Sequence, residues 1–407
     1  MQSTNLLILF VCLLLGKAYK SIQHEKESTI TMRLLLLSCI VCITLSCQQQ
    51  LSTSDEIFVL DEKELVEKDF LLSDFIDSMI IIPPDTSFLF KEIKEEYIAS
   101  QYIILNTSEG IATYDRDGKL LYRIGNIGEG QNEYFKNPRI AINEEKSLIY
   151  VLSNKRLIIY DFTGKVISNR NINSIIDIPI QIIYQDGNLL LIGREYLSND
   201  SQPIYKWVQM NLENYMTEHI EHGDYKLSHY DKIEGVMSKG YTLNNQARYW
   251  SVYNDTIFRI INKGYEIRYL WAKRNERYTY EDTRIPPKSR MCFIPYRICD
   301  TDRFLFVNCF NNTISGEKRT LVFDKMNKEF YNSPIIKENI YGSNIGICFR
   351  NYHIINGREY VSATVQSDDL KNKLKQSRNS DALTLRSKID EEGGELLILM
   401  RIKKTAS

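Results

Sequence analysis

The chain has 407 residues, of which 43% are hydrophobic and 25% charged, and its formal net charge is −1. This composition is that of a globular protein, and the even charge balance gives no electrostatic reason to expect nucleic acid or an anionic membrane surface as a partner. The 26 tyrosines and 16 phenylalanines favour half-buried strands over helices. We therefore expect an all-β protein, which at this length can still form a single domain.

Two short apolar runs open the chain, at residues 6–15 and 34–45. Each is shorter than the ~20 apolar residues of a membrane-spanning helix and is typical of the centre of a signal peptide. The charged stretch between them does not belong in one signal peptide. We therefore predict that the natural start is Met32 and that residues 32–46 are the signal peptide, within a leader of residues 1–46.

The second apolar run ends in residues 44–47, Thr-Leu-Ser-Cys, which resemble a bacterial lipobox, although Thr44 stands where that box usually has leucine. The cysteine of a lipobox is acylated and becomes the first residue of the mature protein. Polar residues follow at once, as a flexible tether requires. We predict a lipid on Cys47, a tether over residues 47–56 and a place in the cell envelope, on the periplasmic or surface face of the outer membrane. The alternative is a cytoplasmic protein with a buried N-terminal helix.

The clearest internal repeat relates residues 111–124 to residues 157–170. Tyr114 aligns with Tyr160, which gives an offset of 46 residues. Repeats of roughly 40–50 residues with several strands each are typical of propeller blades, because radial stacking covers both faces of each sheet. Units of this kind centre near residues 105, 155, 195, 255, 315 and 360. The pattern predicts six blades.

Turn residues separate the predicted strands, most clearly at 185–188 and at 356–357, where they are typical of hairpins. One polar helical stretch, at residues 368–388, is predicted to be an insertion on the rim. We expect strands from both ends of the chain, residues 57–60 and 396–402, to close the ring, because closure removes exposed sheet edges.

The segment GNIGEGQNEY at residues 125–134 resembles the GxxGxGPxEY turn of Bacteroidetes-type six-bladed β-propeller lipoproteins, which are related to NHL-repeat propellers. Gln131 replaces the usual proline. Residues 71–82, 253–260 and 391–404 resemble the opening, middle and closing strands of that family. The resemblance implies a six-bladed propeller over residues 57–404 and leaves its biochemistry open. It also implies a structural turn motif made by Gly125, Gly128, Gly130, Glu133 and Tyr134.

Three of the five histidines of the chain, His219, His222 and His229, lie in one segment. Together with nearby acidic residues they are weak candidates for a metal site. In propeller enzymes, however, the metal ligands come from several blades, so a solvated loop is the better interpretation. We expect no metal and no cofactor.

The remaining signals do not indicate a catalytic centre. The cysteines of the predicted propeller show no zinc-ligand spacing, which favours buried free thiols over a metal site or disulfides: Cys292, Cys299, Cys309 and Cys348. The glycines at residues 125–130 are not followed by the helix that a nucleotide-binding fingerprint needs. No GxSxG elbow and no spaced carboxylate pair stands out.

These observations favour a binding or scaffold module for a glycan, a peptide or a partner protein, acting as a lipid-anchored monomer. The alternative is a periplasmic hydrolase or lyase whose site lies at the central channel. Binding is favoured because it needs only aromatic anchors and satisfied polar groups, which are abundant here. An enzyme would instead bring three or more His, Asp or Glu side chains together from separate blades.

Overall fold

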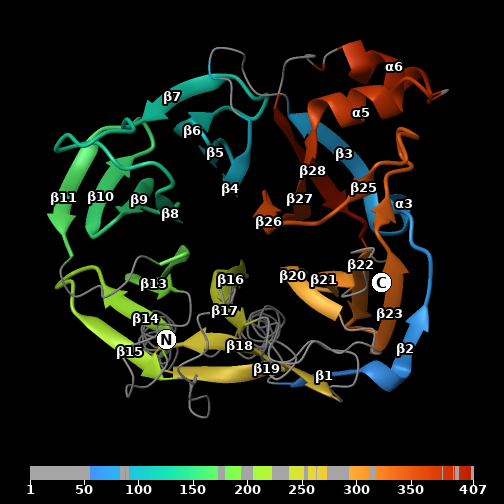
Figure 1. The fold of residues 1–407 in the computed structure, drawn as a ribbon, viewed down its shortest axis with the longest axis horizontal. Coiled ribbons are helices and arrows are strands. Elements are labelled where there is room, and N and C mark those ends of the chain that lie inside the picture. The colour runs from blue at the N-terminus through green and yellow to red at the C-terminus, as the bar shows by residue number, and fades with distance from the viewer. Residues whose placement is uncertain are drawn as a thin grey trace, which may run out of the picture. The chain divides into compact units, whose positions relative to one another are not determined.

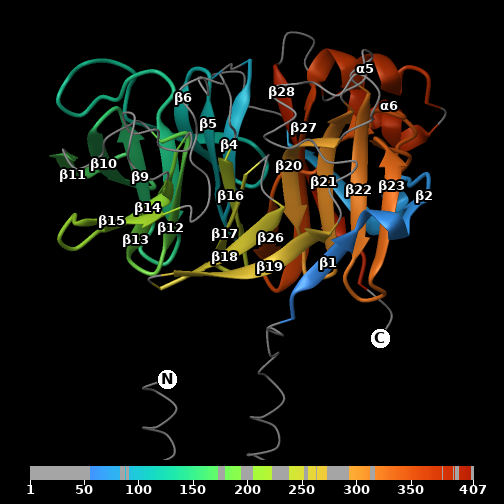
Figure 2. The same cartoon turned by 60° about the horizontal axis from the view of Figure 1, so that its bottom comes forward.

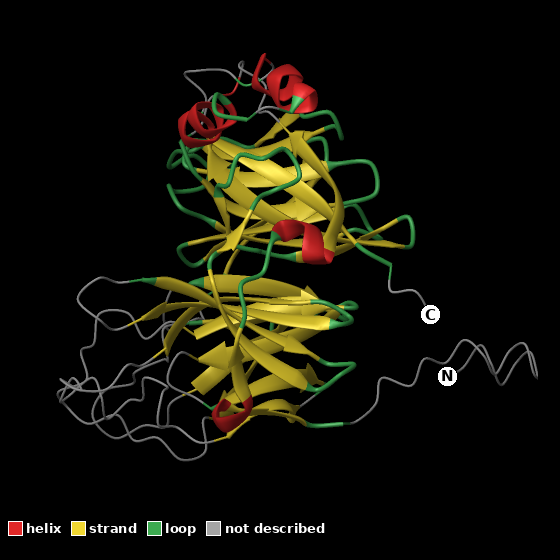
Figure 3. Ribbon diagram, turned by 90° about the vertical axis from the view of Figure 1, so that its right-hand side faces the viewer, coloured by secondary structure: helices red, strands yellow, loops and turns green. Residues whose placement is uncertain are grey.

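The computed structural model describes residues 56–404, except for the following gaps: 83–87, 89–90, 173–178, 194–204, 222–237, 252–254, 263, 273–292, 312–316, 378, 388 and 390–393. Cys47 and the predicted leader lie outside the described residues. Six sheets of four or five strands stand around a common centre (Figure 1), and strands dominate the fold (Figure 3). The predicted six-bladed, all-β architecture is confirmed. No helix within the described ranges is long and apolar enough to cross a membrane.

The first three blades follow one another along the chain. Blade 1 consists of β4 (Ile93–Ile98), β5 (Ile103–Thr107), β6 (Gly110–Tyr114) and β7 (Leu120–Ile124). Blade 2 consists of β8 (Arg139–Asn143), β9 (Leu148–Ser153), β10 (Arg156–Asp161) and β11 (Val166–Asn171). Blade 3 consists of β12 (Gln181–Gln185), β13 (Asn188–Ile192), β14 (Tyr205–Asn211) and β15 (Thr217–Glu221).

The last three blades each take one strand from the N-terminal part of the chain. Blade 4 consists of β16 (Ser238–Leu243), β17 (Gln246–Ser251), β18 (Thr256–Ile261), β19 (Gly264–Ala272) and β1 (Phe58–Asp61). Blade 5 consists of β20 (Phe293–Asp300), β21 (Phe304–Asn311), β22 (Lys318–Asp324), β23 (Glu329–Pro334) and β2 (Leu65–Glu67). Blade 6 consists of β26 (Tyr352–Ile355), β27 (Arg358–Gln366), β28 (Glu395–Ile402) and β3 (Ile76–Ile82).

Short elements complete the fold. These are the 3-10 helix η1 (Glu62–Glu64), the helix α3 (Leu72–Phe75) and the two-stranded sheet of β24 (Ile336–Lys337) and β25 (Gly346–Ile347). The predicted helical insertion is confirmed as α5 (Ser367–Leu374) and α6 (Ser380–Ser387), which lie beside blade 6 (Figure 2). Leu370 and Leu374 anchor α5 in the core of that blade.

The ring closes where β28 pairs with β3, with Leu399 opposite Ile80. The prediction that residues 57–60 form the closing strand is wrong. Those residues lie in β1, which pairs in parallel with β19 at the outer edge of blade 4. The seven residues of β3 pair along most of the eight-residue β28, whereas β1 has only four residues.

Neighbouring blades pack face to face, so the middle strands are buried on both sides. Every residue of β5 and β6 is buried, as expected for a strand covered by another sheet on each face. Between blades 3 and 4, Trp207 and Tyr249 pack with ring centroids 5.2 Å apart. Such apolar layers hold the ring rigid around its centre.

The hairpins predicted at residues 185–188 and 356–357 are confirmed. Asp186 and Gly187 have φ of +48° and +80°, and Asn356 and Gly357 have φ of +51° and +70°. Positive φ at both central residues defines the two-residue turn whose twist matches that of antiparallel strands. These turns fix the register of the first two strands in blades 3 and 6.

Candidate functional site

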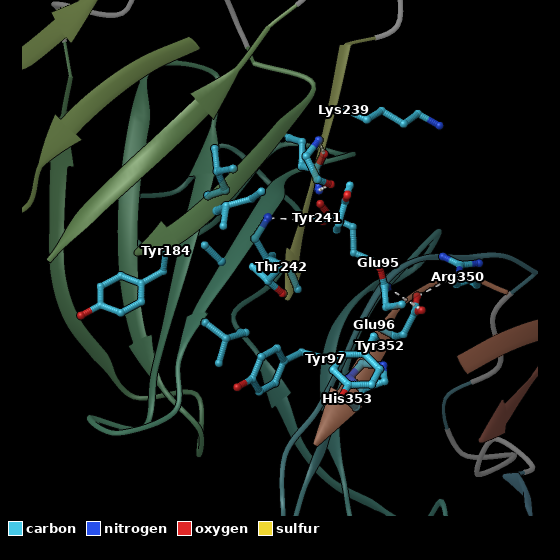
Figure 4. Close-up of a pocket in the computed structure, with 18 of the residues that line it drawn as sticks. Glu95, Glu96, Tyr97, Tyr184, Lys239, Tyr241, Thr242, Arg350, Tyr352 and His353 are labelled. Atoms are coloured by element: carbon cyan, nitrogen blue, oxygen red, sulfur yellow. Dashed lines mark hydrogen bonds and ion pairs between the residues drawn. The ribbon is translucent and has the colours of Figure 1, made fainter. Parts of the chain in front are cut away.

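The first strand of every blade contributes residues to a cavity of about 960 Å³ at the centre of the ring. Figure 4 shows part of its lining, with side chains from β4, β12, β16 and β26. Charged, amide and tyrosine side chains make up much of this wall. We call this cavity the central channel.

Two neighbouring carboxylates of β4 point toward different blades. Glu95 accepts hydrogen bonds from the Asn106 side chain at 2.6 Å and from the Ile140 backbone of blade 2 at 3.3 Å. Burial raises the pKa of Glu95 to about 7. A carboxyl group held in such surroundings is more typical of a functional site than of a purely structural one.

Glu96 faces blade 6 instead. Its side chain has no exposed area and forms an ion pair with Arg350 at 2.9 Å. The Asn351 amide and the Ser362 hydroxyl each donate a hydrogen bond to Glu96 at 2.7 Å. Arg350 also donates to the carbonyl oxygens of Ile93 and Lys94, at 3.0 and 2.9 Å. This network (Figure 4) joins the last blade to the first.

His353 is the one histidine that lines the channel among the described residues. Its Nε2 lies 3.4 Å from the Ser362 hydroxyl. Burial lowers the pKa of His353 to about 4, although nearby Glu96 acts in the opposite direction. The imidazole is therefore neutral at neutral pH and serves as a hydrogen-bonding group rather than a charge.

Besides Lys94 of β4, the positive side chains of the channel come from blades 4, 5 and 6. Lys239 of β16, Arg297 of β20 and Arg350 before β26 all line the channel. The Lys239 ammonium donates to the Tyr296 carbonyl oxygen at 2.7 Å. Burial first, and then the charges of Arg297 and Arg350, lower the pKa of Lys239 to about 8.

Two partly exposed tyrosines add aromatic surface on blades 1 and 3 (Figure 4). The Tyr97 hydroxyl donates to Glu144 at 2.9 Å. Tyr184 stacks on Tyr150, with ring centroids 5.6 Å apart and planes 9° from parallel. Both rings are thus held in place, as stacking platforms for a flat ligand should be.

The acidic groups of the channel are bonded to other protein groups, and Glu96 shares the Ser362 hydroxyl with His353. Glu95, Glu96 and Glu144 each accept hydrogen bonds from neighbouring protein groups. Within the described ranges, no group of three or more His, Cys, Asp and Glu side chains is placed to hold a metal ion. The channel therefore offers a ligand positive charge and hydrogen-bonding groups.

The turn motif predicted at residues 125–134 lies between blades 1 and 2, outside the channel lining. Gly130 donates its backbone N–H to the Glu133 carboxylate at 2.8 Å. Tyr134 is buried, and its hydroxyl accepts a hydrogen bond from the Ile111 backbone at 3.0 Å. These bonds hold the loop against blade 1.

Two glycines of this loop have no room for a side chain. A Cβ on Gly125, which has φ of +61°, would lie 2.5 Å from the Tyr160 hydroxyl. A Cβ on Gly128 would lie 2.0 Å from the Glu133 carboxylate. The glycines let the loop pack closely, and nothing in their placement indicates a phosphate site.

Of the histidine segment that was predicted to be a solvated loop, the structure describes only the part up to Glu221. His219 lies in strand β15, opposite Val208 of β14, and burial lowers its pKa. Its neighbours His222 and His229 lie outside the described residues. His219 faces no part of the central channel lining.

The described cysteines Cys299, Cys309 and Cys348 are free thiols. Two of them are buried, and the Sγ of half-buried Cys348 lies 3.2 Å from the Tyr296 hydroxyl. Cys292 lies outside the described residues. The charged residues of the channel are those that sequence reasoning missed, because nothing in the sequence shows which strand of a blade is innermost.

Comparison with solved structures shows the same fold elsewhere. A candidate exported protein of Bacteroides fragilis superposes with a TM-score of 0.65 at 17% identity, covering 86% of this chain and 100% of that one. The extracellular domain of a one-component system from B. thetaiotaomicron (TM-score 0.40, 10% identity, 70% of this chain and 32% of that one) and BamB from Moraxella catarrhalis (TM-score 0.39, 11% identity, 80% and 99%) are more distant.

No curated protein matches the chain. The profile of a family described as a domain of unknown function, DUF4934, matches residues 56–401. That match spans all six blades, and with the Bacteroides neighbour it confirms the predicted resemblance to a Bacteroidetes-type propeller family. The chain therefore belongs to the DUF4934 family of six-bladed propellers.

Proposed function

We propose that this protein is a ligand-binding module of the bacterial cell envelope and that its ligand enters the central channel. The observation that carries the proposal is the cavity of about 960 Å³, to which all six blades contribute polar or charged side chains. Pockets for small ligands have volumes of roughly 300–1,000 Å³. The channel therefore suits a small molecule, a short glycan or a peptide end better than the face of a partner protein.

Catalysis is less well supported than binding. A hydrolase or lyase needs a general acid or base within hydrogen-bond reach of its substrate. Glu96 is occupied by Arg350, Asn351 and Ser362. Glu95, whose pKa of about 7 suits a base, already accepts from Asn106.

The predicted lipid on Cys47 agrees with this role, since a tethered receptor stays where its ligand arrives. The fold that the chain shares with a candidate exported protein is consistent with an envelope location. We place the propeller outside the cytoplasm, held by the tether of residues 47–56.

A soluble form tests the proposal. Every described strand lies between Phe58 and Ile402, so residues 48–407 contain the complete ring. We would screen this form against glycan and peptide arrays, beside a variant in which Thr242→Trp narrows the channel. Thr242 is exposed and lines the channel (Figure 4), so the larger ring fills space without disturbing the core.

The matched control is Thr384→Trp, on the exposed face of α6. We expect a ligand that binds the unmodified form and the control but not the Thr242 variant. Ligands that bind all three forms equally would overturn the channel as the site. Turnover of an arrayed compound that Glu95→Gln abolishes would overturn binding in favour of catalysis.

A further inference from the structure

Three positive side chains from three consecutive blades face the same cavity. Lys239 lies on β16 of blade 4, Arg297 on β20 of blade 5, and Arg350 just before β26 of blade 6. The Lys239 ammonium touches the carbonyl oxygen of Tyr296, the residue next to Arg297. The three charges thus lie along one wall of the channel.

Of these three side chains, only Arg350 forms an ion pair among the described residues. Arg350 is paired with Glu96 and also bonds two backbone carbonyl oxygens. Lys239 makes one hydrogen bond, to a neutral carbonyl. In the described part of the chain, no hydrogen bond or ion pair engages the Arg297 guanidinium. The Arg297 side chain is nevertheless partly buried in the wall of the channel.

Leaving two positive charges together in a partly dehydrated cavity is unfavourable, since burial and like charge both disfavour the charged form. The pKa of Arg297 accordingly lies below its ordinary value, through burial first and then through Arg350. An anion entering the channel would relieve this repulsion and would accept charge-assisted hydrogen bonds, which are among the strongest available to a protein.

The backbone of β20 is irregular at this point. Pro295 lies opposite Cys309 and Arg297 opposite Asn308, which leaves Tyr296 as an extra residue in the strand. Bulges of this kind re-aim side chains and occur preferentially near functional sites. Among the innermost strands, β4 is also irregular beside Glu95. The positions of the channel charges are therefore set by the backbone.

The other side of the channel is aromatic. Tyr97 and Tyr184 are partly exposed there and are held by Glu144 and Tyr150. A ligand with a ring at one end and a negative group at the other would contact both walls. Arginine and lysine suit such a group because they donate several hydrogen bonds to an oxyanion.

We propose that Lys239 and Arg297 form a binding site for an oxyanion group (a carboxylate, sulfate or phosphate) carried by a small ring-containing ligand. Arg350, fixed by Glu96, adds to the positive potential without being free to turn toward the ligand. This inference rests on the proposed binding function and names the class of its ligand.

Calorimetric titration of residues 48–407 with glucuronic acid, glucose 6-sulfate and glucose 6-phosphate would test it, with glucose as the neutral control. We expect at least one of the three acids to bind about tenfold or more tightly than glucose, and which acid does so identifies the anion. Arg297→Gln and Lys239→Gln should each weaken that binding about tenfold to a hundredfold. Lys119→Gln, which removes an exposed charge far along blade 1, should change nothing.

Two further measurements separate a binding role from a structural one. Arg297→Gln should leave the melting temperature of the unliganded protein unchanged or higher, because it removes repulsion. Arg297→Lys should retain part of the binding. Equal affinity for glucose and the acids, failure of all three acids to bind at millimolar concentration, or full affinity in Arg297→Gln would overturn the oxyanion site. The proposed binding function would still stand if a neutral ligand bound the unmodified protein but did not bind the Thr242→Trp variant.

Discussion

Asp300 joins two blades through a fully buried carboxylate. Lys325 of blade 5 forms an ion pair with it at 2.5 Å, and the side chains of Asp300 and Lys325 are 0% and 7% exposed. From blade 4, the Tyr269 hydroxyl donates to the carboxylate at 2.8 Å and the Tyr241 hydroxyl at 3.1 Å. The substitution Asp300→Asn keeps the size of the side chain and removes its charge.

Removing one partner of a buried ion pair costs about 3–5 kcal/mol, because the other charge stays buried without compensation. For Asp300→Asn we expect a cost near the lower end of this range. Lys325 still donates to the Thr301 carbonyl oxygen, and both tyrosines can donate to the amide oxygen of asparagine. The predicted loss of unfolding free energy is therefore about 3 kcal/mol.

Thermal unfolding measures this loss. The compact unit Ile57–Ser407 has an unfolding entropy of about 0.7 kcal/mol/K, at about 2.1 cal/mol/K per residue. A loss of about 3 kcal/mol then lowers the melting temperature by about 4 °C. The control Asp117→Asn, in an exposed turn of blade 1, should shift it by less than about 1 °C.

A double-mutant cycle with Lys325→Met makes the test sharper. If the two charges stabilise each other, the double variant loses about 2 kcal/mol less than the sum of the single losses. Strictly additive losses of unfolding free energy would show that the pair does not hold blades 4 and 5 together. An Asp300→Asn protein with the melting temperature of the unmodified protein would show the same.

Four further outcomes are expected. The pKa of Glu95 is about 7 in the folded protein, above its value in the unfolded chain, so the folded protein binds this proton more tightly. The free energy of unfolding should therefore decrease as the pH rises from about 4.5 to 7. Glu95→Gln should reduce that fall and add about 1–3 kcal/mol at pH 8 in urea unfolding; an unchanged pH profile would contradict this. The pKa values of Tyr241 and Tyr269 are raised by burial, so stability should fall again above about pH 10, and replacing both by phenylalanine should reduce that alkaline loss. Cys47→Ala should move the protein from the membrane to the soluble fraction, whereas continued sedimentation with membranes would exclude the lipid. Deleting residues 396–402 should abolish cooperative unfolding of the whole ring, since β28 carries the closing pair, and a truncated chain that kept its native transition would refute this.

The blades could be predicted because their signals are local. Tyr114 and Tyr160 end the third strands of blades 1 and 2, β6 and β10, as their alignment indicated. The Asn356-Gly357 turn has the backbone that its residue types favour. Repeat spacing and turn chemistry depend only on residues near each other in the sequence.

Closure could not be predicted, because it depends on pairing between distant segments. Residues 57–60 and 76–82 are both short apolar runs near the start of the chain. Which of them closes the ring depends on its pairing with β19 or β28, more than 200 residues further along the chain. Local pattern carries no such information.

The channel charges were missed for a related reason. Alternation along a strand shows only that neighbouring side chains face opposite sides. It does not show which strand of a blade is innermost, so the sequence cannot distinguish Arg297 from an arginine that faces solvent in an outer strand. The bulge before Arg297 shifts the alternation as well. One signal was present: once the blades are assigned, charged residues in the first strand of each blade become candidates for the channel.

This distinction changes what the net charge of −1 means for ligands. An even balance over the whole chain argues against partners that contact an extended charged surface, such as nucleic acid. It places no limit on a cavity, where a few groups act in surroundings of low dielectric and over distances shorter than the screening length. Lys239 and Arg297 are two of 51 positive side chains, but both line one cavity. A small anion can therefore be the preferred ligand of a protein that has almost no net charge.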